Sequence, residues 1–332
     1  MKKTVVNEIF QKFEKLKVIV IGDAMVDTYL WGKIERISPE APIPIVSITD
    51  HENRLGGAAN VSLNINFLGA TPLLFSVIGD DEKGKAFLGL LKKRKLSAEG
   101  IIVNSDRKTT VKTRVISSGQ HIARIDEESI EYISSELENQ LFNSIKSTID
   151  KQQIDVIIFV DYDKGVITPR LIKKITDLAI EKGIHTAVDP KTRNFQTYKN
   201  IDLFKPNFNE FKIGTNKKLK KGDLDGLLKE AVALKQKKGY KFIFVTLSEL
   251  GVLISNGVEE SHYPANIRYI ADVSGAGDTV ISVASLCLSA KLSPKLLALM
   301  SNIAGGLVCE KVGVVPIDKE LLIKEVIANI DL

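Results

Sequence analysis

Cysteine and histidine are scarce in this chain of 332 residues. The two cysteines, Cys287 and Cys309, both stand in apolar helical runs, which favours buried, reduced thiols over a disulfide framework. The four histidines are far apart in sequence, and none has the spacing of a metal-ligand motif. The composition therefore argues against a disulfide-stabilised secreted domain and against a zinc-binding fold.

Long apolar runs and a large excess of one charge are also missing. No apolar run reaches membrane-spanning length, and the lysine-containing N-terminus lacks the apolar core and cleavage site of a signal peptide. Lys and Arg number 46 against 41 Asp and Glu, and the densest basic run, residues 216–223, is typical of a solvated loop. We therefore predict a cytoplasmic protein that binds neither membrane nor nucleic acid.

Short apolar runs, typical of buried strands, alternate with helical patterns along the chain. This alternation predicts an α/β fold with a mostly parallel central sheet flanked by helices, in which ligands bind beyond the carboxyl ends of the strands. The strand runs begin at Lys17, Leu73, Asp155, His185 and Lys241, and the helical patterns span 86–93, 134–149, 169–182 and 224–237.

Two segments, 28–50 and 109–126, break this alternation. Both are rich in β-branched and turn residues and carry no helical period. We interpret them as antiparallel strands of a small sheet that serves as a lid, and an ordinary edge hairpin is the alternative. Since no linker or change of composition divides the chain, we expect one domain, 1–332, with this small β-sheet as an appendage.

A glycine-rich segment precedes an apolar helical run late in the chain. Gly275, Ala276 and Gly277 stand just before a helix that is established by Val280. Unpaired N–H groups and the helix dipole favour an anion at such a place, and glycines let it approach the main chain. The segment therefore predicts a cradle for a phosphate-like group.

The carboxylate of Asp278 stands in the same segment, where it would repel an anion. It makes sense as a general base that takes a proton from a hydroxyl while a phosphoryl group arrives. A helix cap acting through the dipole, worth about 1 kcal/mol, is the alternative, and the segment alone does not decide. Neither a P-loop nor a dinucleotide-binding pattern fits, because the Lys-Ser/Thr pair and the third glycine are missing.

A second cluster lies near the N-terminus. Gly56 and Gly57 precede a helix whose first turn contains Asn60, so bare backbone and an amide side chain could face a polyhydroxy ligand. Asp23 and Asp27 follow the first strand, where carboxylates can accept hydrogen bonds from neighbouring hydroxyls. Helix packing by the glycines and a turn at the aspartates are the alternatives.

A third cluster follows Pro206. Asn207 and Glu210 are three residues apart, on one side of a first helical turn, which suits a hydrated cation with its phosphates. The same spacing also fits a capping arrangement with Glu210 near the third helical position. Both interpretations stay open at this point.

Taken together, these clusters resemble the ribokinase-type (PfkB) carbohydrate kinases over nearly the whole chain. The N-terminal family pattern is met by Gly56, Gly57, Asn60, Gly69 and Gly79, and the C-terminal pattern by Asp272–Asp278. The resemblance implies a ribokinase-like α/β fold with a small β-sheet lid, and a kinase that uses ATP and Mg²⁺.

Within this family the chain is similar to the kinases of D-glycero-D-manno-heptose 7-phosphate. This resemblance implies phosphorylation of the anomeric hydroxyl to the 1,7-bisphosphate, a step towards ADP-heptose for lipopolysaccharide. A kinase of another sugar, sugar phosphate or nucleoside is the nearest rival, and a non-catalytic sugar-phosphate-binding regulator is the second. The matching stretches are 36–46, 56–65, 111–126, 161–167 and 189–191.

The resemblance also assigns roles to individual residues. Asp278 is the general base, and the amides of Gly275, Ala276 and Gly277 form the anion hole. The nucleotide is bordered by Asn207, Phe208, Asn209, Glu210, Thr246, Ser248, Glu249, Gly251, Asn302 and Gly306, with Glu210 on the metal. The sugar is held by Asp27, Gly56, Gly57 and Asn60, and its phosphate by Arg114, Arg124, Lys164 and Lys191.

The chain departs from some relatives, and other properties stay open. Many relatives carry a nucleotidyltransferase domain with a His-x-Gly-His motif, whereas the last histidine here is His262, so we expect a separate protein for that step. Asp163 stands beside Lys164, at a position where the resemblance implies a small residue. A monovalent cation near Asp272 and a homodimer formed through the lid sheets are left open by the resemblance.

Overall fold

A computed structural model describes residues 2–265 and 269–330, and its main feature is a nine-stranded sheet, sheet A. The strands pair in parallel, except that β12 is antiparallel to both of its neighbours. The predicted mostly parallel α/β sheet is therefore confirmed. In spatial order the strands are β13 (Glu260–Tyr263), β12 (Val252–Ser255), β11 (Phe242–Thr246), β10 (Leu203–Phe204), β9 (His185–Asp189), β8 (Val156–Val160), β1 (Lys17–Gly22), β4 (Thr71–Gly79) and β5 (Ile101–Asn104).

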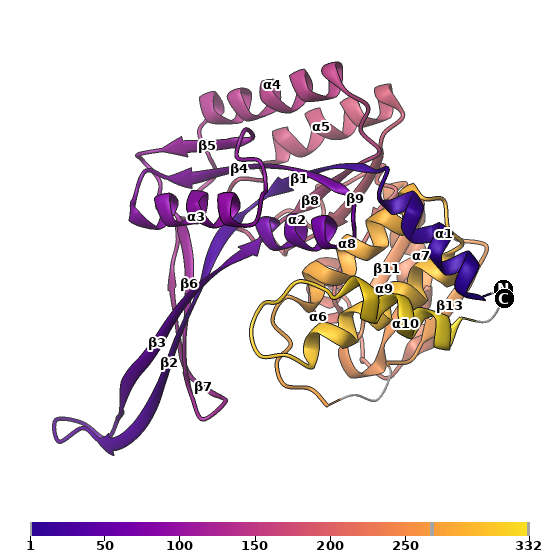
Figure 1. Cartoon of the computed structure of the whole chain (residues 1–332). Helices are drawn as coiled ribbons and strands as arrows, with labels where there is room; N and C mark the ends of the chain where they lie inside the picture. Colours follow the sequence, from indigo (N-terminus) through magenta and orange to yellow (C-terminus); the bar gives the residue numbers. More distant parts are fainter. Residues whose placement is uncertain (1, 266–268, 331–332) are drawn as a thin grey trace.

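Helices cover both faces of sheet A (Figure 1). Along β1, Val18 and Val20 pack into one core and Ile19 and Ile21 into the other, which explains why this strand is a continuous apolar run. The first core is closed by α1 (Lys2–Phe13), α2 (Ala58–Phe67), α3 (Glu82–Lys93), α8 (Ala276–Ser289), α9 (Pro294–Cys309) and α10 (Lys319–Asn329), and the second by α4 (Ser135–Lys151), α5 (Pro169–Lys182), α6 (Phe208–Thr215) and α7 (Leu224–Lys238).

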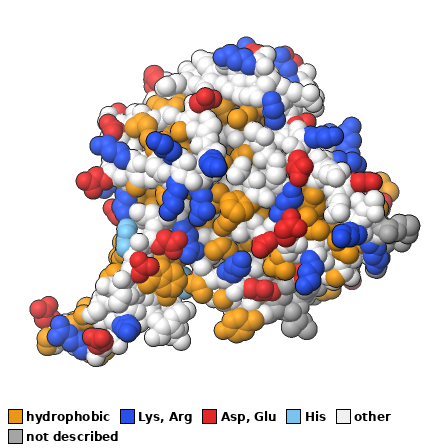
Figure 2. Space-filling model, viewed as in Figure 1, with side chains coloured by type: hydrophobic (Ala, Val, Ile, Leu, Met, Phe, Trp, Pro, Cys, Tyr) orange, Lys and Arg blue, Asp and Glu red, His pale blue; other side chains and the backbone are white. Residues whose placement is uncertain are grey.

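A second sheet of four strands, the lid sheet, projects from the layered body (Figures 1 and 2). The two predicted segments lie in it, but the expectation of purely antiparallel pairing is wrong, because β2 and β6 run parallel. The chain reaches β6 only after crossing through α2, β4, α3 and β5, and so returns in the direction of β2. In spatial order its strands are β3 (Pro44–Gly57), β2 (Ala24–Ile37), β6 (Thr110–Ser117) and β7 (Gln120–Glu127).

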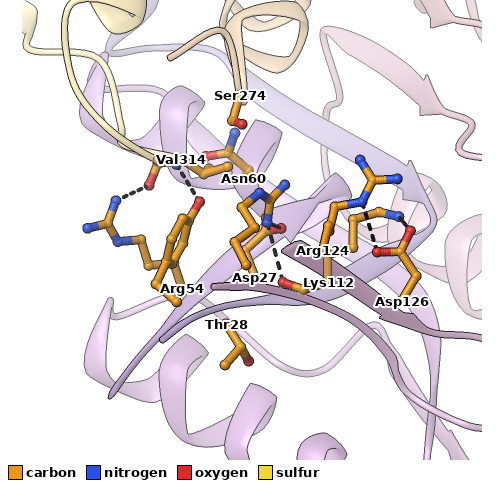
Figure 3. Close-up of polar contacts among 12 residues, drawn as sticks. Asp27, Thr28, Arg54, Asn60, Lys112, Arg124, Asp126, Ser274 and Val314 are labelled. Atoms are coloured by element: carbon orange, nitrogen blue, oxygen red, sulfur yellow. Dashed lines mark hydrogen bonds and ion pairs between the residues drawn. The ribbon is translucent and has the colours of Figure 1, made fainter. Parts of the chain in front are cut away.

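The two faces of the lid sheet differ in chemistry because successive strand residues point to opposite sides. The inner face carries Asp27 and, beside it in the register, Arg54 and Lys112. The outer face carries Thr28 and, two strands away in the same row, Ile125. Figure 3 shows Thr28 on the side of the sheet opposite to Asp27. That the body and this lid sheet form a single domain stays a prediction.

Two expectations about scarce features can be compared with the structure. Cys287 and Cys309 are both buried and unpaired, as predicted. Within residues 2–265 and 269–330, no helix combines the length and the apolar character needed to cross a membrane.

The second core depends on the central strand β8, which makes a stability test straightforward. Phe159 is fully buried there, with its ring 5.9 Å from that of Tyr198. We expect Phe159→Ala to lower the free energy of unfolding by about 3–5 kcal/mol, because the truncation leaves a cavity. Phe67→Ala, at a side chain 40% exposed, is the matched control and should cost less than about 1 kcal/mol. Urea unfolding measures both, and a similar loss in the two variants would contradict this account of the core.

Candidate active site

Asp278 lies in the first turn of α8 and is 2% exposed. Its Oδ2 accepts a hydrogen bond from Nδ2 of Asn60 at 2.8 Å, and its Oδ1 accepts one from the hydroxyl of Tyr162 at 2.7 Å. Both donors come from other elements, since Asn60 belongs to α2 and Tyr162 follows β8. No side-chain cap bond is made at the N-terminus of α8, so a hydrogen-bonded helix cap is not the role of this carboxylate.

The surroundings of Asp278 bring its pKa close to neutral pH. Burial raises its pKa to about 7, and the hydrogen bonds from Asn60 and Tyr162 act in the opposite direction. The nearby carboxylates of Asp189 and Asp27 raise the pKa further. A carboxylate with such a pKa is suited to accepting a proton from an alcohol at neutral pH.

The start of α8 provides a partly open anion cradle beside this carboxylate. Gly275 adopts a φ of 80°, in the left-handed region that favours glycine. The N–H of Ala276 donates to the carbonyl of Val273 at 3.3 Å, so this predicted member of the anion hole is already engaged. In the described part of the chain, the N–H groups of Gly275 and Gly277 have no acceptor bonded to them. Two of the three predicted amides are therefore available to an anion.

The buried Lys205 adds a positive charge beside this cradle. A Cβ atom placed on Gly277 would lie 3.9 Å from Nζ of Lys205, which is 2% exposed. Lys205 is paired with Asp189 at 2.9 Å. Because both groups are desolvated, the ammonium lies close to the cradle with little screening by water.

The inner face of the lid sheet brings a buried ion pair to the other side of the site (Figure 3). Asp27 is 2% exposed, and its Oδ1 lies 2.5 Å from Nη1 of Arg114. A Cβ atom on Gly56 would lie 2.1 Å from Oδ2 of Asp27, so only glycine lets this carboxylate approach the backbone. Gly57 has a φ of 57° and is the N-cap of α2. The structure thus brings together three of the four residues predicted to hold the sugar.

The fourth, Asn60, is fully buried, and its amide is bonded to Asp278. Asp23, for which a contact to sugar hydroxyls and a turn are both open, accepts hydrogen bonds from the backbone N–H groups of Tyr162, Lys164 and Val166 at 2.8, 3.0 and 3.0 Å. Its carboxylate therefore fixes the loop after β8.

Each of the four cations predicted to hold the substrate phosphate already has a carboxylate partner. Lys164 pairs with Glu128 at 2.8 Å, and Arg124, whose side chain is 59% exposed, pairs with Asp126 at 3.0 Å. Arg114 pairs with Asp27, as described above, and Lys191 forms an ion pair with Glu210. Lys191 therefore lies beside a residue predicted for the nucleotide. A phosphate bound by Arg114, Arg124 or Lys164 would have to replace the carboxylate with which that cation is paired.

Asp163 adopts a left-handed backbone conformation, with a φ of 57°. The following N–H, of Lys164, reaches Asp23 at 3.0 Å. The Oδ2 of Asp163 accepts from the backbone N–H of Arg193 at 3.4 Å.

The residues predicted for the nucleotide fall into two groups. Asn207 forms an isolated bridge with Thr246 and caps α6, whose first residues are Phe208 and Asn209. In the second group, Asn302 donates to the carbonyl of Pro264 at 2.9 Å, and Gly251, at a φ of 85°, also packs closely against Pro264. Gly306 lies one turn after Asn302 on α9. Ser248 and Glu249 belong to the short helix η1 (Ser248–Leu250), and the exposed Glu249 forms an ion pair with Lys221.

The capping alternative for Asn207 and Glu210 is realised in the structure. The side chain of Asn207 accepts from the N–H of Glu210 at 2.9 Å, and the carboxylate of Glu210 accepts from the N–H of Asn207 at 2.8 Å. The other oxygen of Glu210 faces Lys191. In the ranges that the structure describes, no group of three or more His, Cys, Asp or Glu could hold a metal ion. Both carboxylate oxygens of Glu210 are thus engaged within the protein, and its role as a metal contact stays a prediction.

Asp272, where a monovalent cation was left open, is engaged with the lid. It accepts from the N–H groups of Ser274 and Gly313 at 2.9 Å each, and it lies 3.3 Å from Nε2 of His121 on β7. The cation stays a prediction.

Sequence reasoning missed Tyr162, Lys205 and Asp189 as parts of the site. Each follows or ends a parallel strand, which is where such a sheet places its ligands. This position at the strand ends could have identified them as residues of the ligand-binding edge. It could not have shown which side chains they contact.

Comparison with known proteins places this arrangement among the enzymes that phosphorylate sugars. The chain belongs to the pfkB family of carbohydrate kinases, which matches residues 15–320.

Its sequence is similar to proteins called bifunctional protein HldE. The one from Pelobacter propionicus is 37% identical over 314 residues, which are 94% of this chain and 64% of that protein. The one from Helicobacter pylori is 37% identical over 297 residues, which are 90% of this chain and 63% of that protein. The chain thus spans just under two thirds of the length of these relatives.

The fold is similar to that of phosphofructokinase-2 from Escherichia coli, solved in complex with substrates and products. The TM-score is 0.78 at 18% identity, over 94% of this chain and 98% of that chain. The ribokinase-like fold expected from the sequence is thereby confirmed.

The raised pKa of Asp278 predicts a specific dependence of stability on pH. Its pKa of about 7 in the folded protein is above the value of about 3.9 in an unfolded chain. Between these values the folded state binds more protons, so this group makes stability fall as pH rises. We expect Asp278→Asn to gain about 2–3 kcal/mol of stability relative to the unmodified protein between about pH 5 and about pH 8.

Urea unfolding at several pH values measures this difference. The control is Asp177→Asn, whose side chain is 60% exposed on α5, and it should leave the pH dependence unchanged. A difference between Asp278→Asn and the unmodified protein that stays constant with pH would contradict the burial account.

Proposed function

We propose that this carbohydrate kinase transfers the γ-phosphoryl group of ATP to the anomeric hydroxyl of D-glycero-D-manno-heptose 7-phosphate. The observation that carries the proposal is the buried carboxylate of Asp278, with a pKa of about 7. It lies next to the N–H groups of Gly275 and Gly277, which have no bonded acceptor among the described residues. The similarity to proteins called HldE and the stretches shared with heptose 7-phosphate kinases support the choice of sugar. The supply of ATP makes the cytoplasm the expected location.

In this reaction Asp278 accepts the proton of the anomeric hydroxyl as its oxygen forms a bond to the γ-phosphorus. The bond from that phosphorus to the bridging oxygen breaks, ADP leaves, and Asp278 later releases the proton to water. The N–H groups of Gly275 and Gly277, with the ammonium of Lys205 nearby, stabilise the charge on the transferred group. Mg²⁺, when bound near Glu210, would neutralise phosphate charge. The lid sheet excludes water, so that ATP is not lost to hydrolysis.

A phosphorylated sugar needs cations that a neutral sugar does not, and the inner face of the lid sheet supplies them. Lys112 and Arg124 lie on this face (Figure 3), and Arg114 is opposite Arg124 in the strand register. Lys164 is tied to the same face through Glu128, which also lies 3.6 Å from Lys112. The 7-phosphate would compete with Asp126 and Glu128 for these cations. This concentration of positive groups favours a sugar phosphate over ribose or a nucleoside.

Turnover with a panel of acceptors tests the proposal. We expect ADP release with heptose 7-phosphate to exceed that with ribose and with fructose 1-phosphate. We expect Asp278→Asn to reduce turnover by about 10²- to 10⁴-fold while ATP binding survives, because the variant cannot accept the proton. Asp177→Asn is the control and should keep full activity.

Three outcomes would change this conclusion. Preference for a neutral sugar would remove the heptose assignment. Turnover of Asp278→Asn within a few fold of the unmodified enzyme would remove the base assignment. No ADP formation with any acceptor would favour a sugar-phosphate-binding regulator.

We also propose a homodimer formed through the outer face of the lid sheet. Ile34, Ile48 and Ile125 lie on this face and are 39%, 47% and 54% exposed. Figure 2 shows hydrophobic side chains among the charged ones of the protruding lid. Packing two such faces against each other would bury these side chains symmetrically.

Sedimentation velocity tests the homodimer. We expect the unmodified protein to sediment as a dimer and Ile125→Lys as a monomer. In a twofold-symmetric dimer each subunit contributes this residue, so the substitution would bury two lysines in the interface. Ile180→Lys, at a side chain 58% exposed on α5, is the control and should stay dimeric. A monomeric unmodified protein, or a dimeric Ile125→Lys variant, would exclude this interface.

A further inference from the structure

Tyr162 connects three parts of the candidate active site. Its hydroxyl donates to Oδ1 of Asp278 at 2.7 Å, and its ring centroid lies 5.3 Å from Nζ of Lys191. Its backbone N–H donates to Oδ2 of Asp23 at 2.8 Å, which fixes the residue at the end of β8. The side chain is therefore held at both ends, by Asp23 through the backbone and by Asp278 through the hydroxyl.

The hydroxyl of Tyr162 has a defined role in the geometry of Asp278. The carboxylate is held at Oδ2 by Asn60 and at Oδ1 by Tyr162, so both its rotamer and the plane of its oxygens are fixed. Each carboxylate oxygen has two acceptor positions, so one position at Oδ1 stays available to an alcohol. Burial raises the pKa of Tyr162 well above its ordinary value, which keeps the hydroxyl a donor at neutral pH.

We propose that Tyr162 is a positioning residue for phosphoryl transfer, which holds Oδ1 of Asp278 where the acceptor hydroxyl meets the anion cradle. The role rests on the proposed function, since it acts through the base of that reaction. It differs from a packing role because it depends on one hydrogen atom, the one on the phenol oxygen. Phenylalanine keeps the ring beside Lys191 and removes only this donor.

Charged and polar groups from every neighbouring element act on Asp278. Asp27 of the lid sheet and Asp189 at the end of β9 disfavour its charged form, while Asn60 and Tyr162 favour it. The cations nearby are Lys191 and Lys205, which are paired with Glu210 and Asp189. Removing the Tyr162 hydroxyl leaves all these groups in place and takes away one donor to the carboxylate. The carboxylate then binds its proton more tightly, and the base becomes available only at higher pH.

The test compares Tyr162→Phe with Tyr132→Phe in the full-length chain. The hydroxyl of Tyr132 also donates to a side-chain oxygen, that of Asn194 at 2.9 Å, and it has no contact with Asp278. We expect Tyr162→Phe to lower kcat by about 10- to 30-fold and to move the acid limb of kcat/KM by about one unit to higher pH, with KM for ATP within about twofold. Tyr132→Phe should match the unmodified enzyme in all three.

A measurement without turnover separates this inference from the proposed function. The protein is labelled at the aspartate carboxyl carbon with ¹³C, and the resonance that disappears in Asp278→Asn is followed through a pH titration. Its midpoint should be higher by about one unit in Tyr162→Phe than in Tyr132→Phe. This readout does not depend on which sugar is the substrate.

The outcomes are distinct. An unchanged midpoint and acid limb in Tyr162→Phe overturn the positioning role, even if kcat falls, because loss of packing alone would lower activity without moving either. Absence of turnover by the unmodified enzyme with every acceptor overturns the proposed function, while the NMR titration still decides the contact. Thermal unfolding of both variants verifies that each one is folded.

Discussion

The burial of one carboxylate, that of Asp278, is the constraint on which the rest of the site depends. A carboxylate removed from water is costly unless hydrogen-bond donors replace the solvent. Here the donors are Asn60 and Tyr162, which are 218 and 116 residues away in sequence and both neutral. Asp27 and Asp189 instead face Arg114 and Lys205. Burial raises the pKa of both carboxyls, and these cations act in the opposite direction. Neutral partners stabilise the charge of Asp278 without preventing it from taking a proton, and this distinguishes it from its neighbours.

The topology of sheet A brings these groups together. The order β10, β9, β8, β1 places four parallel strands side by side, so their carboxyl ends share one edge. Lys205, Asp189, Tyr162 and Asp23 stand at or just beyond the ends of these strands. The carboxylate of Asp23 accepts hydrogen bonds from backbone N–H groups of the loop that carries Tyr162, and it contributes to the site by holding this loop. The position of Tyr162 at this edge therefore depends on the carboxylate of Asp23.

Local signals made part of this predictable from sequence. Glycines before an apolar helical run identified the start of α8 and its carboxylate, and alternating apolar runs identified the sheet. The spacing of Asn207 and Glu210 fitted a capping box and a cation site equally, because both need the same geometry in the first helical turn. The capping box was recognised only from the hydrogen bonds of the structure. Partners such as Asn60 for Asp278 depend on how distant elements pack, which no local pattern encodes. The parallel pairing of β2 and β6 was missed for the same reason, since it follows from a crossover through four elements.

The base of the lid sheet and the anion cradle form one connected unit. The hydroxyl of Tyr29 accepts from the N–H of Val314 at 2.7 Å. Nη1 of Arg54 donates to the carbonyl of Val314 at 3.1 Å (Figure 3). The side chain of Val314 lies 3.3 Å from where a Cβ atom on Gly275 would stand. From Ala24 to Tyr29, β2 is buried, whereas from Lys33 to Ile37 it is exposed. The base of the lid sheet therefore cannot move without disturbing the turn at Gly275, so we expect any closure of the lid to be confined to the strand residues beyond this base.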